Sequence, residues 1–236
     1  MNYFPQITHI IYDLDGLLLD TESIHAQVNQ EVTSRYGKIF DKHIKCKITG
    51  RKSIDSARKI VELLELPVTP ENYLQQRNIL TYQRFPQAKP MPGAVRLTQH
   101  LYQNKIPQAI ATSSSREPFN LKTKNYQEWF QLFDYIVVGD DPHIKGGKPA
   151  PDIFLIAAER LGVSTEKCLV FEDSVAGMEA ALAAGMSLVV VPDPDMDKHL
   201  FHSAHQILNS LAEFQPHLWQ LCLLYTSPSP RDHQPS

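Results

Sequence analysis

A short apolar run that ends on two aspartates constrains the fold of this chain more than any other feature of its sequence. Residues 8–12 read Thr-His-Ile-Ile-Tyr, a β-branched run typical of a buried strand. Asp13 follows directly, and Asp15 and Gly16 come next. In an open α/β sheet, ligands bind beyond the carboxyl ends of the strands. Two carboxylates at that edge favour a hard-cation site with a nucleophilic aspartate, the groups that phosphoryl transfer needs.

Calcium loops and acidic turns also contain Asp-x-Asp-Gly strings. A calcium loop counted from Asp13 needs a helix before it and a glutamate at its twelfth position, where this chain has Ile24. A strand precedes the string instead, so a calcium loop is excluded. An acidic turn without chemistry stays open from these residues alone.

Charge and composition favour an ordinary soluble enzyme. The hydrophobic share is 42% and the net charge is -3, which gives no reason to expect nucleic-acid or anionic-membrane binding. No stretch approaches the ~18 apolar residues of a membrane span, and no secretory signal is evident. Cys46, Cys168 and Cys222 are an odd number at wide spacing, typical of reduced thiols. We expect a cytoplasmic monomer.

Apolar runs and helical patterns alternate along the chain as they do in βαβ units. Strands are predicted near residues 7–12, 107–112, 134–138, 167–171 and 187–191. Helices are predicted around residues 93–104, 151–161 and 174–184. The expected fold class is α/β, with a doubly wound, mainly parallel sheet and helices on both faces.

The segment between the first two predicted strands has helical patterns and no predicted strand. Apolar residues at helical spacing recur over residues 24–32 and again over 54–64, and Pro70 suits the first turn of a third helix. A helical insertion of this size predicts a separate small domain, hinged at residues 17–20 and 85–92. Seated over the acidic strand end, such a cap could exclude water during chemistry.

The predicted core domain therefore comprises residues 1–18 and 89–221, and the helical cap domain comprises residues 19–88. The tail at 222–236 is rich in proline and serine and lacks periodicity, so we expect it to be disordered.

Three further strand ends carry polar groups. Thr112 and Ser113 follow the second predicted strand, where hydroxyls and free N–H groups form either an anion site or an ordinary helix cap. Lys148 lies in a proline-containing turn before a helix, and a lysine alone is usually just solvated. Glu172 and Asp173 end the fourth strand, which repeats the design of the first. Together these groups place acids, a phosphate-binding threonine and a lysine in one crevice.

In order and spacing, these four motifs resemble those of the haloacid-dehalogenase-like phosphatase superfamily, whose members have a Rossmann-like core and, in one branch, a small helical cap. The resemblance covers residues 7 to about 221. It implies that Asp13 is the nucleophile, which becomes an aspartyl-phosphate. It also implies that Asp15 is the general acid and base.

The resemblance implies the remaining roles as well. Thr112 and the N–H of Ser113 bind the transferring phosphoryl group, and Lys148 bridges this group and the nucleophile. The implied cofactor is Mg²⁺, which needs oxygen ligands and keeps several waters. Its implied ligands are Asp13, the backbone carbonyl of Asp15, Glu172 and Asp173.

Within the superfamily, the chain is most similar to the phosphatases that act on pseudouridine 5'-phosphate. The stretches that carry this similarity are 13–22, 139–142, 147–149, 152–154, 168–173, 180–186 and 214–219. The implied reaction is hydrolysis of a small phosphate monoester, with pseudouridine 5'-phosphate as the first candidate.

Two alternatives remain open. Related β-phosphoglucomutases share the core motifs and have a histidine where this chain has His25, so a phosphomutase or a sugar-phosphate phosphatase stays possible. These mutases bind a second phosphate with a cap arginine, and this chain has Ser53 at the matching place, with Arg51 and Lys52 nearby. Residues 49–52 are only a weak signature of substrate choice. A non-catalytic phosphate-binding module is the second alternative, disfavoured because a binder would tolerate loss of the aspartate pair.

Overall fold

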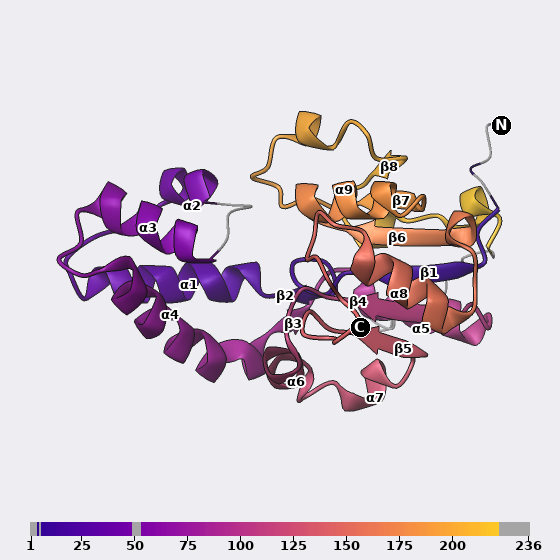
Figure 1. Cartoon of the computed structure of the whole chain (residues 1–236), viewed down its shortest axis with the longest axis horizontal. Coiled ribbons are helices and arrows are strands. Elements are labelled where there is room, and N and C mark those ends of the chain that lie inside the picture. The colour runs from indigo at the N-terminus through magenta and orange to yellow at the C-terminus, as the bar shows by residue number, and fades with distance from the viewer. Residues whose placement is uncertain (1–3, 5, 49–52, 222–236) are drawn as a thin grey trace, which may run out of the picture.

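The computed structural model describes residue 4 and residues 6–48 and 53–221. Its centre is a six-stranded parallel sheet in the order β5-β4-β1-β6-β7-β8 (Figure 1). The strands are β1 (His9–Tyr12), β4 (Gln108–Ala111), β5 (Tyr135–Val137), β6 (Cys168–Glu172), β7 (Ser187–Val190) and β8 (Gln206–Ile207). The predicted doubly wound α/β class is confirmed. The two-residue strand β8 was not predicted, because it is too short to show a pattern.

Alternate residues of β1 pack into two hydrophobic clusters, one on each face of the sheet. Ile10 and Tyr12 belong to one cluster and Ile11 to the other, as the period of two requires. The first cluster is covered by α5 (Ala94–Gln103), α6 (Arg116–Thr123) and α7 (Gln127–Phe130). The second is covered by α8 (Asp152–Leu161) and α9 (Val175–Ala183).

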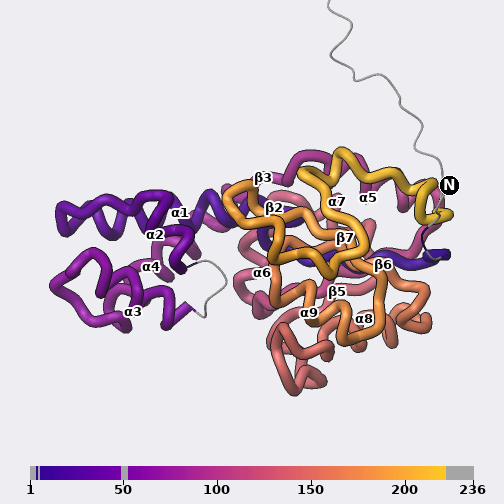
Figure 2. The backbone as a smooth tube through the Cα atoms, turned by 90° about the horizontal axis from the view of Figure 1, so that it is seen from above, coloured from indigo at the N-terminus to yellow at the C-terminus, as the bar shows by residue number. Residues whose placement is uncertain are grey.

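Four helices form a second lobe beside the sheet, clear of it in both views (Figures 1 and 2). They are α1 (Glu22–Ser34), α2 (Lys42–Ile48), α3 (Ser53–Leu64) and α4 (Pro70–Arg84). The helix α4 begins as its sequence suggests, because Pro70 stands in its first turn and the Thr69 side chain accepts the Asn72 N–H. We propose that this lobe is the cap domain, with boundaries at 18/19 and 88/89.

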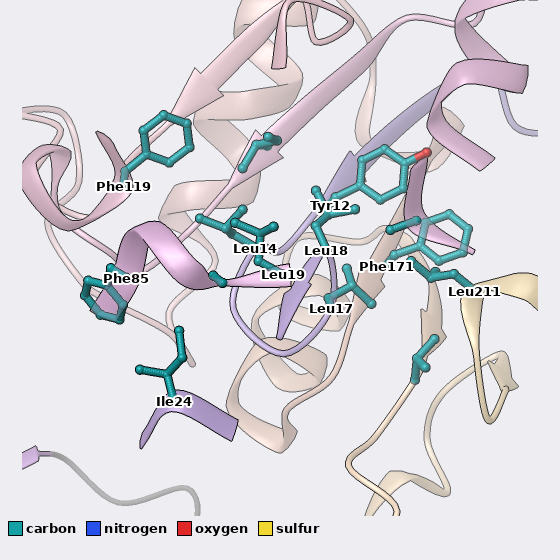
Figure 3. Close-up of a cluster of buried hydrophobic side chains, with 14 of the residues drawn as sticks. Tyr12, Leu14, Leu17, Leu18, Leu19, Ile24, Phe85, Phe119, Phe171 and Leu211 are labelled. Atoms are coloured by element: carbon teal, nitrogen blue, oxygen red, sulfur yellow. The ribbon is translucent and has the colours of Figure 1, made fainter. Parts of the chain in front are cut away.

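The two hinge segments pair with each other, which the sequence analysis did not predict. Strand β2 (Leu19–Asp20) is antiparallel to β3 (Lys89–Pro90). Two-residue strands carry no periodicity, so no pattern could predict them. Buried leucines fill the loop before β2 and the first position of β2, between the core strands and the cap (Figure 3). These are Leu14, Leu17, Leu18 and Leu19.

Short 3₁₀ turns complete the described chain: η1 (Phe85–Gln87), η2 (Thr165–Lys167), η3 (Lys198–Phe201), η4 (Leu211–Glu213) and η5 (Pro216–Trp219). No helix within the described residues combines the length and the apolar character needed to cross a membrane. The predicted tail at 222–236 and the weak cap signature at 49–52 lie outside the described residues.

Candidate active site

Three adjacent strands bring the predicted residues together. Strands β4 and β6 flank β1, and Tyr12 at the end of β1 is level with Ile110 and Phe171. The Asp13 N–H continues the ladder by donating to the Phe171 carbonyl. Because parallel strands end at the same edge, segments more than ninety residues apart in sequence meet at one place.

Lys148 connects two of the predicted carboxylates. Its Nζ lies 2.5 Å from Asp13 Oδ1 and 2.6 Å from Glu172 Oε1, and it also donates to the Ala111 carbonyl at 3.1 Å. The ammonium packs over the Phe154 ring, 4.9 Å from its centre. Burial opposes its charge, but the two carboxylates outweigh burial and raise the Lys148 pKa above its ordinary value. This lysine is therefore a fixed cation beside the predicted nucleophile.

Glu172 is fully buried and both of its carboxylate oxygens are engaged. Oε1 accepts from Lys148, while Oε2 accepts from the N–H groups of Asp173 and Ser174 and from the Ser174 hydroxyl. A Cβ on Gly177 would overlap this carboxylate, so the helix start lies directly against it. The predicted role of Glu172 as a metal ligand stays untested, and its contacts favour a different task, which is to hold Lys148.

Asp173 differs from Glu172 because its carboxylate has no hydrogen-bond donor among the described residues. It lies against Gly16, which has φ +83° and where a Cβ would overlap Asp173 Oδ2. Burial, followed by the Glu172 and Asp13 charges, raises the Asp173 pKa well above its ordinary value. A half-buried carboxylate without a donor beside another acid is a suitable ligand for a cation.

Asp13 and Asp15 have different electrostatic surroundings, which shift their pKa values in opposite directions. Burial raises the pKa of Asp13 to about 7, with Lys148 opposing this effect and Glu172 adding to it. Burial also disfavours the charge on Asp15, but the neighbouring Lys122 ammonium outweighs it and lowers the Asp15 pKa below its ordinary value.

Lys122 is a site residue that the sequence analysis missed. Its side chain is 3% exposed, and Nζ lies 2.6 Å from both Asp15 Oδ1 and Ser114 Oγ. The Ser114 hydroxyl in turn donates to Asp15 Oδ2 at 2.8 Å, and Thr112 Oγ1 lies 3.3 Å from the same oxygen. The available signal was helical spacing, since Lys122 is three residues after the buried Phe119 on α6.

Thr112 and Ser113 stand where the anion site was predicted. Thr112 is buried and its Oγ1 accepts the Ser114 N–H, whereas Ser113 is exposed. The Ser113 N–H donates to no acceptor among the described residues. A Cβ on Gly139 would overlap the Ser113 carbonyl, so this turn is held closely against the loop after β5. An unpaired N–H at a strand end suits an anionic ligand.

The residues fit Mg²⁺ better as a partly hydrated ion than as a fully caged one. Among the described residues, no three or more His, Cys, Asp or Glu side chains gather into a ready metal site. Mg²⁺ is commonly held by one or two carboxylates, with waters and substrate oxygens completing its octahedron. Asp13 and Asp173, with the Asp15 carbonyl, supply ligands of that kind.

A cavity of about 580 Å³ lies between the two lobes and reaches the site. Asp173, Ser174 and Pro149 line it from the core. Its cap wall includes half-buried or buried polar residues and apolar side chains from α1, α3 and α4. Ligand pockets in proteins have volumes of roughly 300–1,000 Å³, so this space, which meets the site at Asp173, has the size of a small-molecule pocket.

A family model described as haloacid dehalogenase-like hydrolase matches residues 10–191 of the chain. The chain is 44% identical over 220 residues to (DL)-glycerol-3-phosphatase 2 of Arabidopsis thaliana, which covers 91% of this chain and 92% of the relative. It is also 44% identical over 214 residues to a Drosophila melanogaster protein named probable pseudouridine-5'-phosphatase, with 89% and 93% covered.

The fold comparison agrees with the sequence comparison. A solved HAD family hydrolase from Deinococcus radiodurans, with bound phosphate and sodium, superposes with a TM-score of 0.78 at 28% identity. The match covers 92% of this chain and 97% of that one.

Proposed function

The chain belongs to the haloacid dehalogenase-like hydrolase family and is a phosphoric monoester hydrolase, and we propose that it hydrolyses pseudouridine 5'-phosphate with the help of Mg²⁺. The observation that carries the chemical part of this proposal is the ion-pair network of Asp13, Lys148 and Glu172 at the sheet edge. A nucleophilic carboxylate beside a buried lysine suits attack on a dianionic phosphate.

Asp13 acts as the nucleophile in the proposed reaction. Lys148 holds its Oδ1, which leaves Oδ2 to attack phosphorus. The Asp13–phosphorus bond forms as the bond from phosphorus to the leaving oxygen breaks. Thr112 and the Ser113 N–H bind the phosphoryl oxygens, and Lys148 balances their negative charge.

Asp15 acts as the general acid and base. Protonated Asp15 gives its proton to the leaving alcohol, and the resulting carboxylate then takes one from the water that hydrolyses the aspartyl-phosphate. Lys122 and Ser114 fix the direction in which its carboxyl group points. Bound Mg²⁺, held by Asp13, Asp173 and the Asp15 carbonyl, would reduce the charge repulsion between the acids and the phosphate.

The cap cavity and the relatives limit the choice of leaving group. The cavity volume of about 580 Å³ leaves room for a nucleoside, and one relative is named for pseudouridine 5'-phosphate. The names of two other relatives favour glycerol 3-phosphate as the second candidate substrate. Cytoplasmic location and a monomeric state stay predictions.

Phosphate release from a panel of esters tests the substrate. Pseudouridine 5'-phosphate should have a higher kcat/KM than uridine 5'-phosphate, glycerol 3-phosphate and simple sugar phosphates when all are measured side by side with Mg²⁺. A preference for glycerol 3-phosphate would move the assignment to the second candidate. Equal, slow hydrolysis of every ester would leave only a general phosphatase.

β-Glucose 1-phosphate with a bisphosphate activator tests the mutase alternative. Ser53 is the described residue at the place of the mutase cap arginine, whereas Arg51 and Lys52 lie outside the described residues. We expect phosphate to be released and no isomer to form. Isomer formation without phosphate release would favour a phosphomutase.

A further inference from the structure

Arg77 of α4, a cation on the wall of the cap cavity between the lobes, forms no salt bridge with any described residue, although the charge of Glu22 on the same wall acts on it. Its Nε is buried and has no hydrogen-bond acceptor among the described residues. Leaving a buried donor of a charged group unpaired costs free energy, so such a donor usually has a partner that a ligand or water supplies.

The hydrogen bond that Arg77 does make is with a neutral side chain. Its Nη2 lies 3.1 Å from Nδ1 of His25, and because arginine can only donate, this nitrogen of His25 accepts. Burial, helped by the charge of Arg77, lowers the His25 pKa to about 4, so the ring is neutral near pH 7. The His25 proton is then on Nε2, which makes His25 a second donor on the cavity wall.

The side-chain amide of Asn29 already accepts one hydrogen bond. The Tyr73 hydroxyl donates to Asn29 Oδ1 at 2.9 Å, and both residues line the cavity. The nitrogen of that amide can only donate. Arg77, His25 and Asn29 thus place three donors on this wall beside the Glu22 carboxylate, and oxygen acceptors on a ligand could pair with them.

These donors lie beyond the reacting groups and not among them. Arg77 and His25 come from cap helices, whereas the cavity meets the core at Asp173, Ser174 and Pro149. The His25 ring lies 5.9 Å from the Phe85 ring, which lies 4.5 Å from Nζ of Lys122, the partner of Asp15, so this histidine lies on the path from Arg77 to the reaction centre. A phosphate ester bound at Asp13 would extend its alcohol part toward these donors.

We propose that Arg77 is a specificity-determining residue, whose guanidinium donates to a carbonyl or hydroxyl oxygen on the alcohol part of the substrate. The inference rests on the proposed phosphatase function and adds the chemistry of the leaving group to it. Uracil carbonyls and the hydroxyls of glycerol both supply such oxygens, whereas the ring of phenyl phosphate supplies none.

The test compares Arg77→Met with the wild-type enzyme on pseudouridine 5'-phosphate, glycerol 3-phosphate and phenyl phosphate. A hydrogen bond from a charged donor corresponds to a loss of roughly 10- to 100-fold in kcat/KM. We expect that loss, mainly through KM, on whichever acceptor-bearing ester the wild type prefers. On phenyl phosphate the change should be less than about 3-fold, since the ring offers Arg77 no oxygen acceptor.

Two further variants separate recognition from folding. Arg77→Lys keeps a charged donor and should recover part of the lost affinity. Arg58→Met removes an exposed cap arginine on α3, paired with Asp55, and should leave all three rates unchanged. An equal loss on all three esters in Arg77→Met, or no loss on any, would overturn the inference alone. Absence of phosphate release by the wild type would instead contradict the proposed function.

Discussion

Asp13 and Asp15 are two residues apart in sequence, yet their surroundings shift their pKa values in opposite directions. Burial raises the Asp13 pKa to about 7, whereas Lys122 keeps the Asp15 pKa below its ordinary value. The proposed chemistry needs the reverse, an ionised Asp13 and an Asp15 that can carry a proton. A divalent cation at Asp13 and Asp173, with the charge of a bound phosphate near Asp15, would move both groups in the required direction.

Removing the metal should therefore stop turnover. Phosphate release is expected to vanish in excess EDTA and to return when Mg²⁺ is added back, because Lys148 alone does not balance the charge of Asp13, Glu172 and Asp173 together with a phosphate dianion. Asp173→Asn should raise the Mg²⁺ concentration needed for half-maximal activity. Undiminished activity in EDTA would rule out the metal-dependent mechanism.

Substitution of Asp13 should lower the turnover rate more than substitution of Asp15. Asp13→Asn is expected to abolish turnover almost completely, because an amide is a far poorer nucleophile than a carboxylate. Asp15→Asn should lower kcat by roughly 10²–10⁴-fold, the usual share of a positioned acid and base. Both are checked by steady-state phosphate release on variants whose thermal unfolding is normal. Near wild-type rates in a folded Asp13→Asn would show that the covalent mechanism is wrong.

Lys122 should act through Asp15. Lys122→Met keeps the length of the side chain but removes the ammonium that holds Asp15 and Ser114. We expect kcat on an alkyl phosphate to fall by about 10-fold or more, but by less than in Asp15→Asn. In the first turnover of p-nitrophenyl phosphate the loss should be small, because nitrophenolate leaves without a proton.

The exposed Lys124 supplies the matched control, and Lys124→Met should behave as the wild type. If Lys122→Met lost the same factor on both esters in the first turnover, Lys122 would be structural and not a positioning residue.

At the scale of elements, the strands that could be predicted are those long enough to show a hydrophobic pattern. The five predicted strands became β1, β4, β5, β6 and β7; four of them are buried runs, whereas in β5 only Val137 is buried. Strands β2, β3 and β8 have two residues each, and a period of two cannot be recognised over two residues. Helix α2 was not predicted, and only Ile44 of it is buried.

Some site residues could likewise be predicted from local sequence and others could not. Asp13, Asp15, Thr112, Lys148, Glu172 and Asp173 follow strands or lie in a marked turn, so their positions could be inferred from local sequence. Lys122 and Arg77 lie within helices, where a cation usually faces solvent. Their contacts are tertiary, since Lys122 meets Asp15 across more than a hundred residues of sequence. No local pattern specifies such a partner.

The loop between β5 and α8 should contribute stability that depends on pH. Asp141 accepts hydrogen bonds from the His143 N–H and from Arg160 Nη2 at 2.6 Å, and these tie the loop to α8. Burial raises its pKa, but the hydrogen bonds outweigh burial and lower it to about 2. The unfolded value is about 3.9, so this stabilisation is present above pH 4 and is lost as the pH falls toward 2.

Asp141→Asn should consequently lower the urea midpoint at pH 7, and the gap to the wild type should narrow as the pH falls from 4 toward 2. Asp55→Asn, on the exposed face of α3, is the control and should change the midpoint little. A gap that stayed constant between pH 7 and pH 2 would contradict this role of Asp141.

At the scale of the molecule, one hydrophobic cluster joins the lobes. It runs from Tyr12 and Phe171 in the sheet, through the leucines before β2, to Ile24 and Phe85 at the base of the cap (Figure 3). Phe85 is 4% exposed. Its ring lies 4.5 Å from Lys122 Nζ and 5.9 Å from the His25 ring, so one side chain touches both lobes. Because this packing is continuous, the cap and the core should not unfold independently.

Urea unfolding followed by two probes tests that expectation. Trp129 and Trp219 both lie in the core, whereas α1, α3 and α4 contribute much of the helical circular dichroism. In the wild type the two curves should coincide. Phe85→Ala should cost about 3–5 kcal/mol and should separate the curves, with the helical signal lost first, because it removes a side chain that contacts both lobes and leaves each lobe its own core. Separate transitions in the wild type, or coincident curves in Phe85→Ala with an unchanged midpoint, would show that Phe85 does not couple the lobes.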